Sequence, residues 1–249
     1  MDLTRVKKGI NDIVFRWLIR PHVKRLVKYS LKDQRKHFLK DRKMHELLKT
    51  RLESIDLEEQ LFKDAKPCGK RFELLSRAVE QAKRFDGGEL WLEFGVEAGA
   101  SINHIAGEVQ STVYGFDTFT GLPEAWKTGL YHHARKGKRS LDAVLPKVAS
   151  NVELIPGLFE DTLQPFLEKH AEPVAFVHID CDLYSSTKTV FRQLKLQVGS
   201  VIAFDEYYNY PNWREGEYKA FHEFLAESQM TAKCLGFCPR SGQAAFILC

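Results

Sequence analysis

The spacing of hydrophobic residues divides the chain into a helical first part and an alternating second part. Up to about residue 66, apolar residues recur every three or four positions, which is the period of one helix face. Pro21 interrupts this pattern, and Phe72 to Phe85 forms a separate helical stretch that ends at Asp86-Gly87-Gly88. We therefore expect a helical extension over residues 1–66 and an α/β domain over residues 67–249.

The second part predicts a mostly parallel sheet covered by helices. Strands are expected at 90–94, 112–116, 152–155, 174–179 and 200–204. Helices are expected at 101–109, 141–148, 162–169, 187–196 and 217–226. The last two apolar runs, 231–237 and 243–248, are joined by a short turn and should pair antiparallel. This is the outline of the seven-stranded, Rossmann-like class I methyltransferase fold.

Composition agrees with a folded domain. Of the 249 residues, 44% are hydrophobic and 28% charged, which is too apolar for a disordered chain. No uncharged apolar run reaches the length of a membrane-spanning helix, and the first residues lack the apolar core of a secretory signal. The cysteines are odd in number, so we expect reduced thiols and a cytoplasmic protein; they are Cys68, Cys181, Cys234, Cys238 and Cys249.

Charge is distributed unevenly. Residues 1–51 carry a net charge of +11, whereas the remainder carries −7. The basic helices could pack against the domain or a second copy of the chain, cover the acceptor site, lie on an anionic membrane, or hold RNA phosphates. Acids interleaved over residues 41–60 favour packing or oligomerisation. Peripheral membrane contact stays an alternative, and no nucleic-acid partner is expected because no aromatic-rich RNA motif is present.

A glycine turn follows the first domain strand. Gly95 and Gly99 allow a ligand to approach the backbone, and Ser101 can cap the next helix. The turn has fewer glycines than a dinucleotide site, and Glu93 at the strand end suits a ligand with an amino group. These features favour S-adenosylmethionine as the cofactor.

An acidic residue closes the next strand. Asp117 lies 22 residues beyond Gly95, near the spacing at which a carboxylate accepts hydrogen bonds from a ribose diol. Phe159 and Glu160, after the third strand, are expected to border the adenine. The alternative is that the glycines only form a strand-to-helix turn, that Asp117 caps a loop, and that Asp161 caps a helix.

Paired acids end the fourth and fifth strands. Asp180 and Asp182 follow the fourth strand, and Asp205 and Glu206 follow the fifth. Neighbouring strands lie about 4.8 Å apart, so Asp180, Asp205 and either Glu206 or Asp182 should gather at one point. Clustered carboxylates favour a hard cation such as Mg²⁺, which lowers the pKa of a hydroxyl and orients it. The alternative is that these acids cap helices and bind ribose.

Residues near the same rim are candidates for acceptor binding. Tyr207 and Trp213 follow the fifth strand and could stack on a sugar ring, while Asp182 could bind its hydroxyls. His132 and His133 lie in a polar loop that could cover a substrate. His178 alternates with Asp180 inside an apolar strand and is expected in the core.

Four segments together resemble the macrocin-type O-methyltransferases, which use S-adenosylmethionine to modify sugars of macrolides and related products. They are Trp91-Leu-Glu-Phe-Gly-Val-Glu-Ala-Gly, Tyr114-Gly-Phe-Asp-Thr-Phe-Thr-Gly-Leu-Pro-Glu, His178-Ile-Asp-Cys-Asp-Leu-Tyr-Ser-Ser-Thr and Phe204-Asp-Glu-Tyr. The resemblance covers roughly residues 88–249. It implies metal-dependent methyl transfer to a sugar hydroxyl, with Asp180, Asp205 and Glu206 as metal ligands and Asp180 as a candidate base.

The chain departs from that family at two points. The family usually has Asp-Asp where this chain has Asp205-Glu206, and the loop Tyr131-His-His-Ala-Arg-Lys-Gly-Lys-Arg differs, so the acceptor does not carry over. Three other functions stay open. They are a glycosyltransferase with an Asp-x-Asp site, a non-catalytic adaptor that acts through the basic arm, and a catechol-type methyltransferase with an aromatic acceptor.

Overall fold

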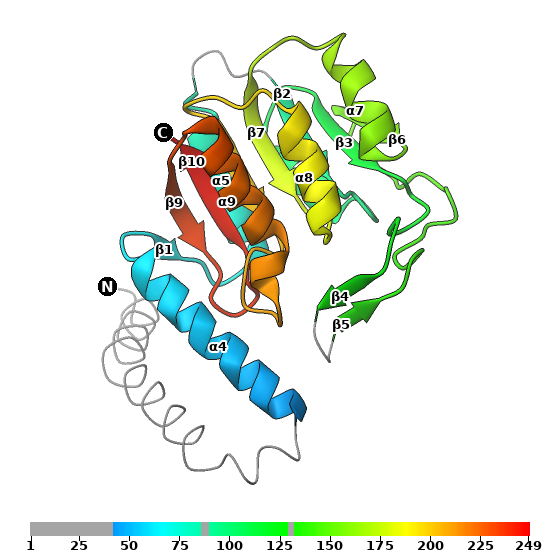
Figure 1. The fold of residues 1–249 in the computed structure, drawn as a ribbon. Helices are drawn as coiled ribbons and strands as arrows, with labels where there is room; N and C mark the ends of the chain where they lie inside the picture. Colours follow the sequence, from blue (N-terminus) through cyan, green and yellow to red (C-terminus); the bar gives the residue numbers. More distant parts are fainter. Residues whose placement is uncertain (1–41, 86–89, 129–131) are drawn as a thin grey trace, which may run out of the picture.

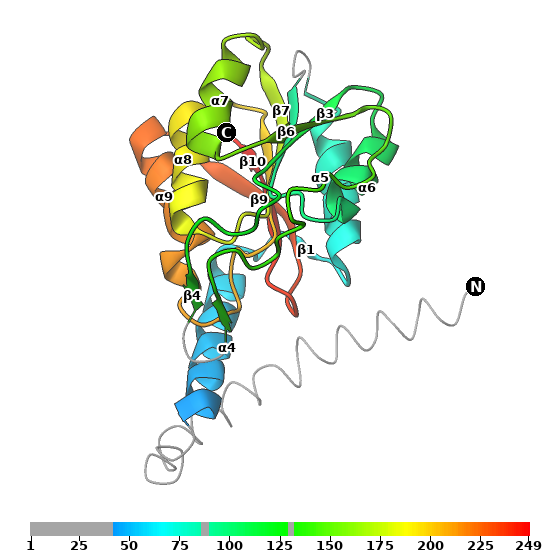
Figure 2. The same ribbon diagram turned by 90° about the vertical axis from the view of Figure 1, so that its right-hand side faces the viewer.

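A central sheet lies between two layers of helices (Figures 1 and 2). The computed structural model describes residues 42–85, 90–128 and 132–249. One face is covered by α5 (Arg71–Ala82) and α6 (Ala100–Glu108). The other is covered by α7 (Phe159–Leu167), α8 (Tyr184–Gln193) and α9 (Glu217–Ser228). Each layer buries its apolar stripe against the sheet.

The sheet has eight strands in the order β1-β9-β10-β8-β7-β2-β3-β6. Their bounds are β1 (Lys66–Pro67), β2 (Leu90–Phe94), β3 (Val113–Asp117), β6 (Val152–Pro156), β7 (Val174–Ile179), β8 (Val201–Phe204), β9 (Ala232–Phe237) and β10 (Ala244–Leu248). Only β10 runs antiparallel to its neighbours. The predicted seven strands and terminal hairpin are confirmed, and β1 adds a two-residue strand at the edge beside β9.

The register of the central strands brings the functional ends together. Every residue of β2, β7 and β8 is buried, as expected for parallel strands covered on both faces. Ile179 pairs with Phe94 on one side and with Phe204 on the other. Consequently the residues that follow these three strands emerge side by side at one edge of the sheet.

The prediction of a helix at 141–148 is wrong. Asp142 and Ala143 have left-handed φ angles of 52° and 61°, and residues 144–149 run without regular structure along α6. The side chain of Asn103 holds this segment, because its Nδ2 donates to the Lys147 carbonyl and its Oδ1 accepts from the Ala149 amide. Leu141 and Val148 pack against the core cluster that contains α6 residues, whereas Val144 and Leu145 are exposed. The apolar spacing therefore arose without a helix.

A small hairpin occupies part of the predicted loop. The strands β4 (Trp126–Thr128) and β5 (His132–Ala134) pair antiparallel outside the main sheet. In Figure 1 the arrowheads of β7 and β9 point toward the end of the sheet where this hairpin and α4 (Arg42–Gln60) lie.

The described part of the N-terminal extension packs on the domain. Leu57 on α4, together with Phe62, belongs to the core cluster shared with β10 and α9. Tyr208 donates its hydroxyl hydrogen to Glu58, and Arg51 donates to the Pro239 carbonyl. The basic residues 1–41 lie outside the described residues, so their oligomer and membrane roles stay predictions.

Two further observations concern the cysteines and the helices. All five cysteines are free thiols in the structure, as the sequence predicts. Among the residues that the structure describes, every helix is too short or too polar to cross a membrane.

Candidate active site

The turn after β2 is shaped by a close approach between two backbones. Gly95 has a φ of 94°, and a Cβ atom there would lie 1.8 Å from the carbonyl oxygen of Asp180. Gly99 has a φ of 84° and immediately precedes α6. Both positions therefore need glycine, one for space and conformation and the other for conformation.

A pocket opens beside this turn, at the carboxyl ends of β2, β3 and β7. Five of the seven residues predicted to bind cofactor line it, namely Gly95, Ser101, Asp117, Phe159 and Glu160. Gly99 and Glu93 do not line it. The pocket also contains Asp180 and Asp182, so the cofactor candidates and one acidic pair share one cavity.

Asp117 fixes the shape of the pocket through backbone hydrogen bonds. Its Oδ2 accepts from the amides of Val96 and Glu97 at 2.8 and 2.9 Å, and its Oδ1 accepts from the Phe119 amide at 2.7 Å. The carboxylate therefore joins the end of β3 to the glycine turn. A ribose diol would meet a carboxylate that is already oriented.

Glu93 is buried and does not line the pocket, so the prediction that it contacts a ligand amino group is wrong. Its Oε1 accepts a hydrogen bond from the Ser101 hydroxyl, and its Oε2 lies 3.2 Å from Nδ1 of His178. Both Glu93 and His178 are buried. Burial opposes a charge on His178, but the Glu93 carboxylate outweighs it and raises the pKa of the histidine. The three side chains support the pocket from beneath.

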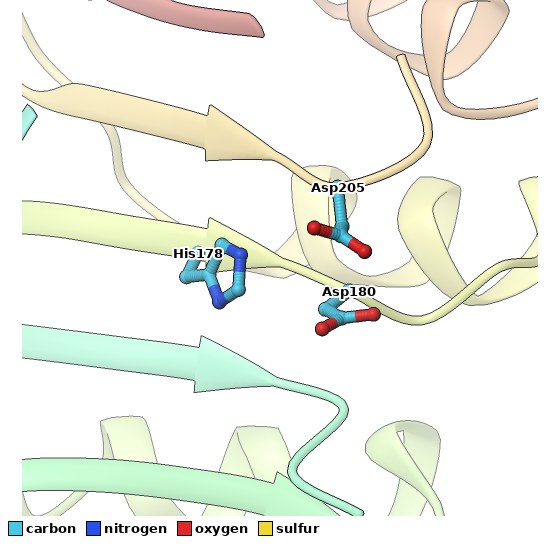
Figure 3. A group of neighbouring side chains, drawn as sticks. All are labelled: His178, Asp180 and Asp205. Atoms are coloured by element: carbon cyan, nitrogen blue, oxygen red, sulfur yellow. The ribbon is translucent and has the colours of Figure 1, made fainter. Parts of the chain in front are cut away.

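Asp180 and Asp205 face each other at the ends of β7 and β8 (Figure 3). The guanidinium of Arg71, at the start of α5, joins them. Its Nη2 donates to Oδ2 of Asp180 at 2.9 Å and its Nη1 donates to Oδ2 of Asp205 at 3.2 Å. The chain thus supplies its own cation to the carboxylate pair.

Ligand atoms of His178, Asp180 and Asp205 lie within 4.8 Å of one another. Among the residues that the structure describes, these three form the group that could hold a metal ion. Two carboxylates and an imidazole are donors that divalent cations accept. Burial, followed by the Asp205 carboxylate, raises the pKa of Asp180 well above its usual range. The donor set fits a divalent cation. Its third member is His178, which the sequence analysis placed only in the core.

Glu206 does not join this set, contrary to the prediction that it is a metal ligand. Its Oε2 is buried without a hydrogen-bond partner, and its backbone amide donates to Oε2 of Glu217 at 3.1 Å. Burial, followed by the Asp180 and Asp205 carboxylates, raises the pKa of Glu206 well above its usual range. Glu206 therefore places a carboxyl group beside the site but outside the donor set.

Asp182 reaches the pocket from a left-handed residue, with a φ of 62°. β7 ends at Ile179, so this turn, and not strand alternation, sets the direction of Asp182, which lines the same pocket as Asp180. Its Oδ2 lies 3.5 Å from Nε of Arg139, whose Nη1 donates to Glu97 at 2.8 Å. Burial raises the pKa of Asp182 to about 6, although Arg139 lowers it.

The aromatic residues predicted to contact the acceptor lie in the core. Tyr207 is 1% exposed and Trp213 is 0% exposed, so neither ring can stack on a ligand. Both are packed among rings of the α9 side, where Trp213 meets Tyr218 edge-on. Half-buried Trp126 on β4 contacts half-buried Tyr210 edge-on at 5.8 Å. The side chains of His132 and His133 lie outside the described residues.

Sequence reasoning missed Arg71, Arg139, Trp126 and Tyr210. Arg71 comes from a helix packed on the sheet 109 positions before Asp180, and no local pattern links the two residues. The basic loop around Arg139 was a visible signal, since a cation near clustered acids is favourable.

Comparisons with known proteins agree with this geometry. A family model described as a methyltransferase domain matches residues 92–207. The O-methyltransferase NovP superposes with a TM-score of 0.52 at 21% identity, covering 71% of this chain and 78% of NovP. The calicheamicin methyltransferase CalS11 superposes with a TM-score of 0.56 at 22% identity, covering 92% of this chain and 93% of CalS11. A search of curated proteins finds no match.

Residues 92–207 thus match a methyltransferase domain, and the strand order is that of the class I methyltransferase fold. In open sheets of this type, ligands bind beyond the carboxyl ends of the strands, where the pocket lies.

Proposed function

We propose that this chain is an O-methyltransferase that transfers the methyl group of S-adenosylmethionine to a hydroxyl group of a sugar or glycosylated small molecule, with the help of a divalent cation. The observation that carries the proposal is the meeting of Asp180 and Asp205 beside the pocket that also contains Gly95, Ser101 and Asp117. A methyl donor and an acidic centre for the acceptor hydroxyl would then lie together.

The pocket residues supply the binding of the methyl donor. Asp117 would accept the ribose hydroxyls, while Phe159, which meets Phe94 edge-on at 5.2 Å, would offer a ring to the adenine. The left-handed turn at Gly95 leaves the backbone free of side chains at the point of approach.

The acidic centre supplies the activation of the acceptor. A divalent cation would be held by Asp180 and Asp205 with His178, and it would lower the pKa of a bound hydroxyl. Glu206 lies outside this donor set, and its Oε2 is buried without a hydrogen-bond partner.

Asp180 would receive the proton that the hydroxyl loses on attack at the methyl group. A carboxylate positioned beside the reacting hydroxyl can accept such a proton. S-adenosylmethionine, when bound, would supply the methyl group to the hydroxyl oxygen and leave as a neutral thioether once its bond from sulfur to that methyl carbon is broken.

The acceptor would enter between the pocket and the β4–β5 hairpin. Trp126 and Tyr210 replace the buried Tyr207 and Trp213 as candidate stacking partners for a sugar ring. The name of NovP, an O-methyltransferase, supports transfer to oxygen, and that of CalS11, a calicheamicin methyltransferase, supports a small-molecule acceptor. The macrocin-type relationship is part of this proposal.

The cell-level expectations complete the proposal. We expect a cytoplasmic protein whose N-terminal extension, residues 1–66, mediates homo-oligomer or peripheral membrane contact. Sedimentation of the whole chain and of a version lacking residues 1–41 would test the first role, and co-sedimentation with anionic vesicles would test the second.

The central experiment is a methyl-transfer assay on the whole chain. S-adenosylmethionine is supplied with a panel of nucleotide-linked deoxysugars, glycosylated macrolides and catechol, and mass spectrometry detects the gain of one methyl group. We expect product with a sugar acceptor, less product in EDTA, and almost none with Asp180→Asn, whereas Glu153→Gln, at an exposed acid on β6, should behave as the wild type.

Other outcomes of this assay contradict the proposal in identifiable ways. Methylation of catechol alone would indicate an aromatic acceptor. Calorimetric heat with nucleotide sugars but none with S-adenosylmethionine would indicate a glycosyltransferase. Turnover that is unchanged by EDTA would contradict the role of the divalent cation but not the methyl transfer itself.

A further inference from the structure

The two acids of the proposed metal site are already paired with a protein cation. Oδ2 of Asp180 and Oδ2 of Asp205 accept hydrogen bonds from Arg71, and Nε of Arg71 lies 3.2 Å from Oδ1 of Asp205. That same Oδ1 also accepts from Nε2 of Gln243 at 3.2 Å. Three of the four carboxylate oxygens therefore face nitrogen donors, and Oδ1 of Asp180 is the exception.

A guanidinium and a divalent cation at these oxygens would repel each other, so each weakens the binding of the other. A metal ion binds carboxylate oxygens at just over 2 Å and holds its ligands in a tight shell, while the positive charge of arginine repels it. Arg71 contacts Oδ2 of both Asp180 and Asp205, so a metal ion bound through either oxygen would lie directly beside the guanidinium charge. The two cations compete for one position.

Arg71 is built to hold this position and also able to leave it. It begins α5, and the helix is anchored beneath the sheet by the buried Leu74, Leu75 and Ala78. Its side chain is 32% exposed, so the guanidinium can reach solvent by rotating about its own bonds while the helix stays in place. Burial disfavours its charge, but the Asp180 and Asp205 carboxylates outweigh it and raise the pKa of Arg71.

We propose that Arg71 is the resident cation of the Asp180–Asp205 pair and that a divalent metal ion binds there only when this guanidinium withdraws. The inference deepens the proposed function, because it makes Arg71 a determinant of metal affinity at the same acidic centre. It has two consequences. The acidic centre folds without metal, and the wild-type chain binds metal more weakly than its acids alone would.

The test measures metal binding directly, without S-adenosylmethionine or an acceptor. Mn²⁺ is titrated into the whole chain and followed by electron paramagnetic resonance and calorimetry. Arg71→Gln should bind Mn²⁺ at least about tenfold more tightly than the wild type, because the competing charge is gone. Arg71→Lys should bind with intermediate affinity, because it keeps the charge but not the forked contact with two acids.

Arg77→Gln is the matched control. Arg77 lies on the same helix with 30% side-chain exposure, close to the 32% of Arg71, and it contacts Glu73 and the Lys66 carbonyl instead of the acidic pair. It should leave the Mn²⁺ affinity unchanged. Adding Asp205→Asn to Arg71→Gln should abolish the gain, which locates the ion at the pair.

Thermal unfolding gives an independent readout. Without metal, Arg71→Gln should melt below the wild type because Asp180 and Asp205 lose their counter-charge, and Mn²⁺ should raise its melting temperature more than that of the wild type. If Arg71→Gln does not fold without metal, refolding in Mn²⁺ but not in its absence also supports the inference.

Three results would overturn it. They are Mn²⁺ affinities within about twofold in the wild type and Arg71→Gln, an absence of Mn²⁺ binding in both, or a loss of S-adenosylmethionine affinity in Arg71→Gln with no change in Mn²⁺ affinity. Methyl transfer by the wild type would still be judged by its own assay, so failure of this inference is distinguishable from failure of the proposed function.

Discussion

The close contact between Gly95 and Asp180 makes a strong prediction about one methyl group. In Gly95→Ala the new Cβ would lie 1.8 Å from the carbonyl oxygen of Asp180, and its nearest other neighbours are also backbone atoms of Asp180 and Cys181. Backbone atoms at the ends of paired strands cannot turn aside as a side chain could. The amide of Asp180 is itself bound to the Phe94 carbonyl at 2.9 Å, so relief must separate β2 from β7 locally.

The magnitude follows from two costs. Overpacking a filled site costs about 1–3 kcal/mol, and a residue with a side chain in the left-handed region costs roughly 1–2 kcal/mol. Gly95→Ala should therefore lower the free energy of unfolding by about 2–5 kcal/mol. It should also displace Asp180 and weaken S-adenosylmethionine binding, because both border the pocket.

Gly107→Ala is the matched control, since Gly107 lies on the next helix, α6, where a new methyl group would meet nothing within 4 Å outside the backbone of its own helix. Alanine there should stabilise the chain by some tenths to about 1 kcal/mol. Urea unfolding followed by fluorescence and calorimetric titration with S-adenosylmethionine measure both effects. A Gly95→Ala protein within about 1 kcal/mol of the wild type, with unchanged cofactor affinity, would refute the reasoning.

Three further predictions concern the acids of the pocket. Asp180→Asn should lower kcat by about 10²–10⁴ with a smaller effect on cofactor affinity, measured by steady-state kinetics and calorimetry; an unchanged kcat would exclude Asp180 as the base. Asp117→Ala should weaken S-adenosylmethionine binding at least about tenfold, because three backbone amides lose their acceptor. An unchanged Kd would show that Asp117 and the turn it holds do not contribute to cofactor binding. Asp182 has a pKa near 6 in the fold against an ordinary 3.8, so the folded state binds its proton more tightly and stability falls as pH rises from about 4 through 6. Asparagine also suits the left-handed backbone of this position. Asp182→Asn should therefore be more stable than the wild type by about 1 kcal/mol at about pH 4.5 and by about 3 kcal/mol at about pH 7.5. Urea unfolding that shows the same difference in unfolding free energy at both pH values would contradict this.

Local patterns determined most of the sheet and helices. Each strand predicted from an apolar run lies within one or two residues of its observed bounds, because residues buried on both faces of a sheet have to be apolar. The segment 141–148 is the exception. Leu141 and Val148 pack against the core cluster that contains α6 residues, whereas Val144 and Leu145 are exposed. Asn103 binds the Lys147 carbonyl and the Ala149 amide, so the segment keeps an irregular course although its apolar spacing is helical.

The candidate site divides in the same way. The glycines of the turn, Asp117, and the acids that end two neighbouring strands were predictable, because parallel strands bring their carboxyl ends to one edge of the sheet. Tyr207 and Trp213 were not, since an aromatic residue after a strand has the same local pattern whether it faces a ligand or the core.

Charge compensation was decided by the tertiary structure alone. The sequence indicates that carboxylates gather and that a cation should join them, but it does not identify the cation. Only packing α5 against β8 brings Arg71 to Asp180 and Asp205, across separations of 109 and 134 positions. The sequence by itself determined which strands form and where their acids emerge, because periodicity and burial are local properties. The partners of those acids depend on contacts between distant segments, which only the folded chain creates.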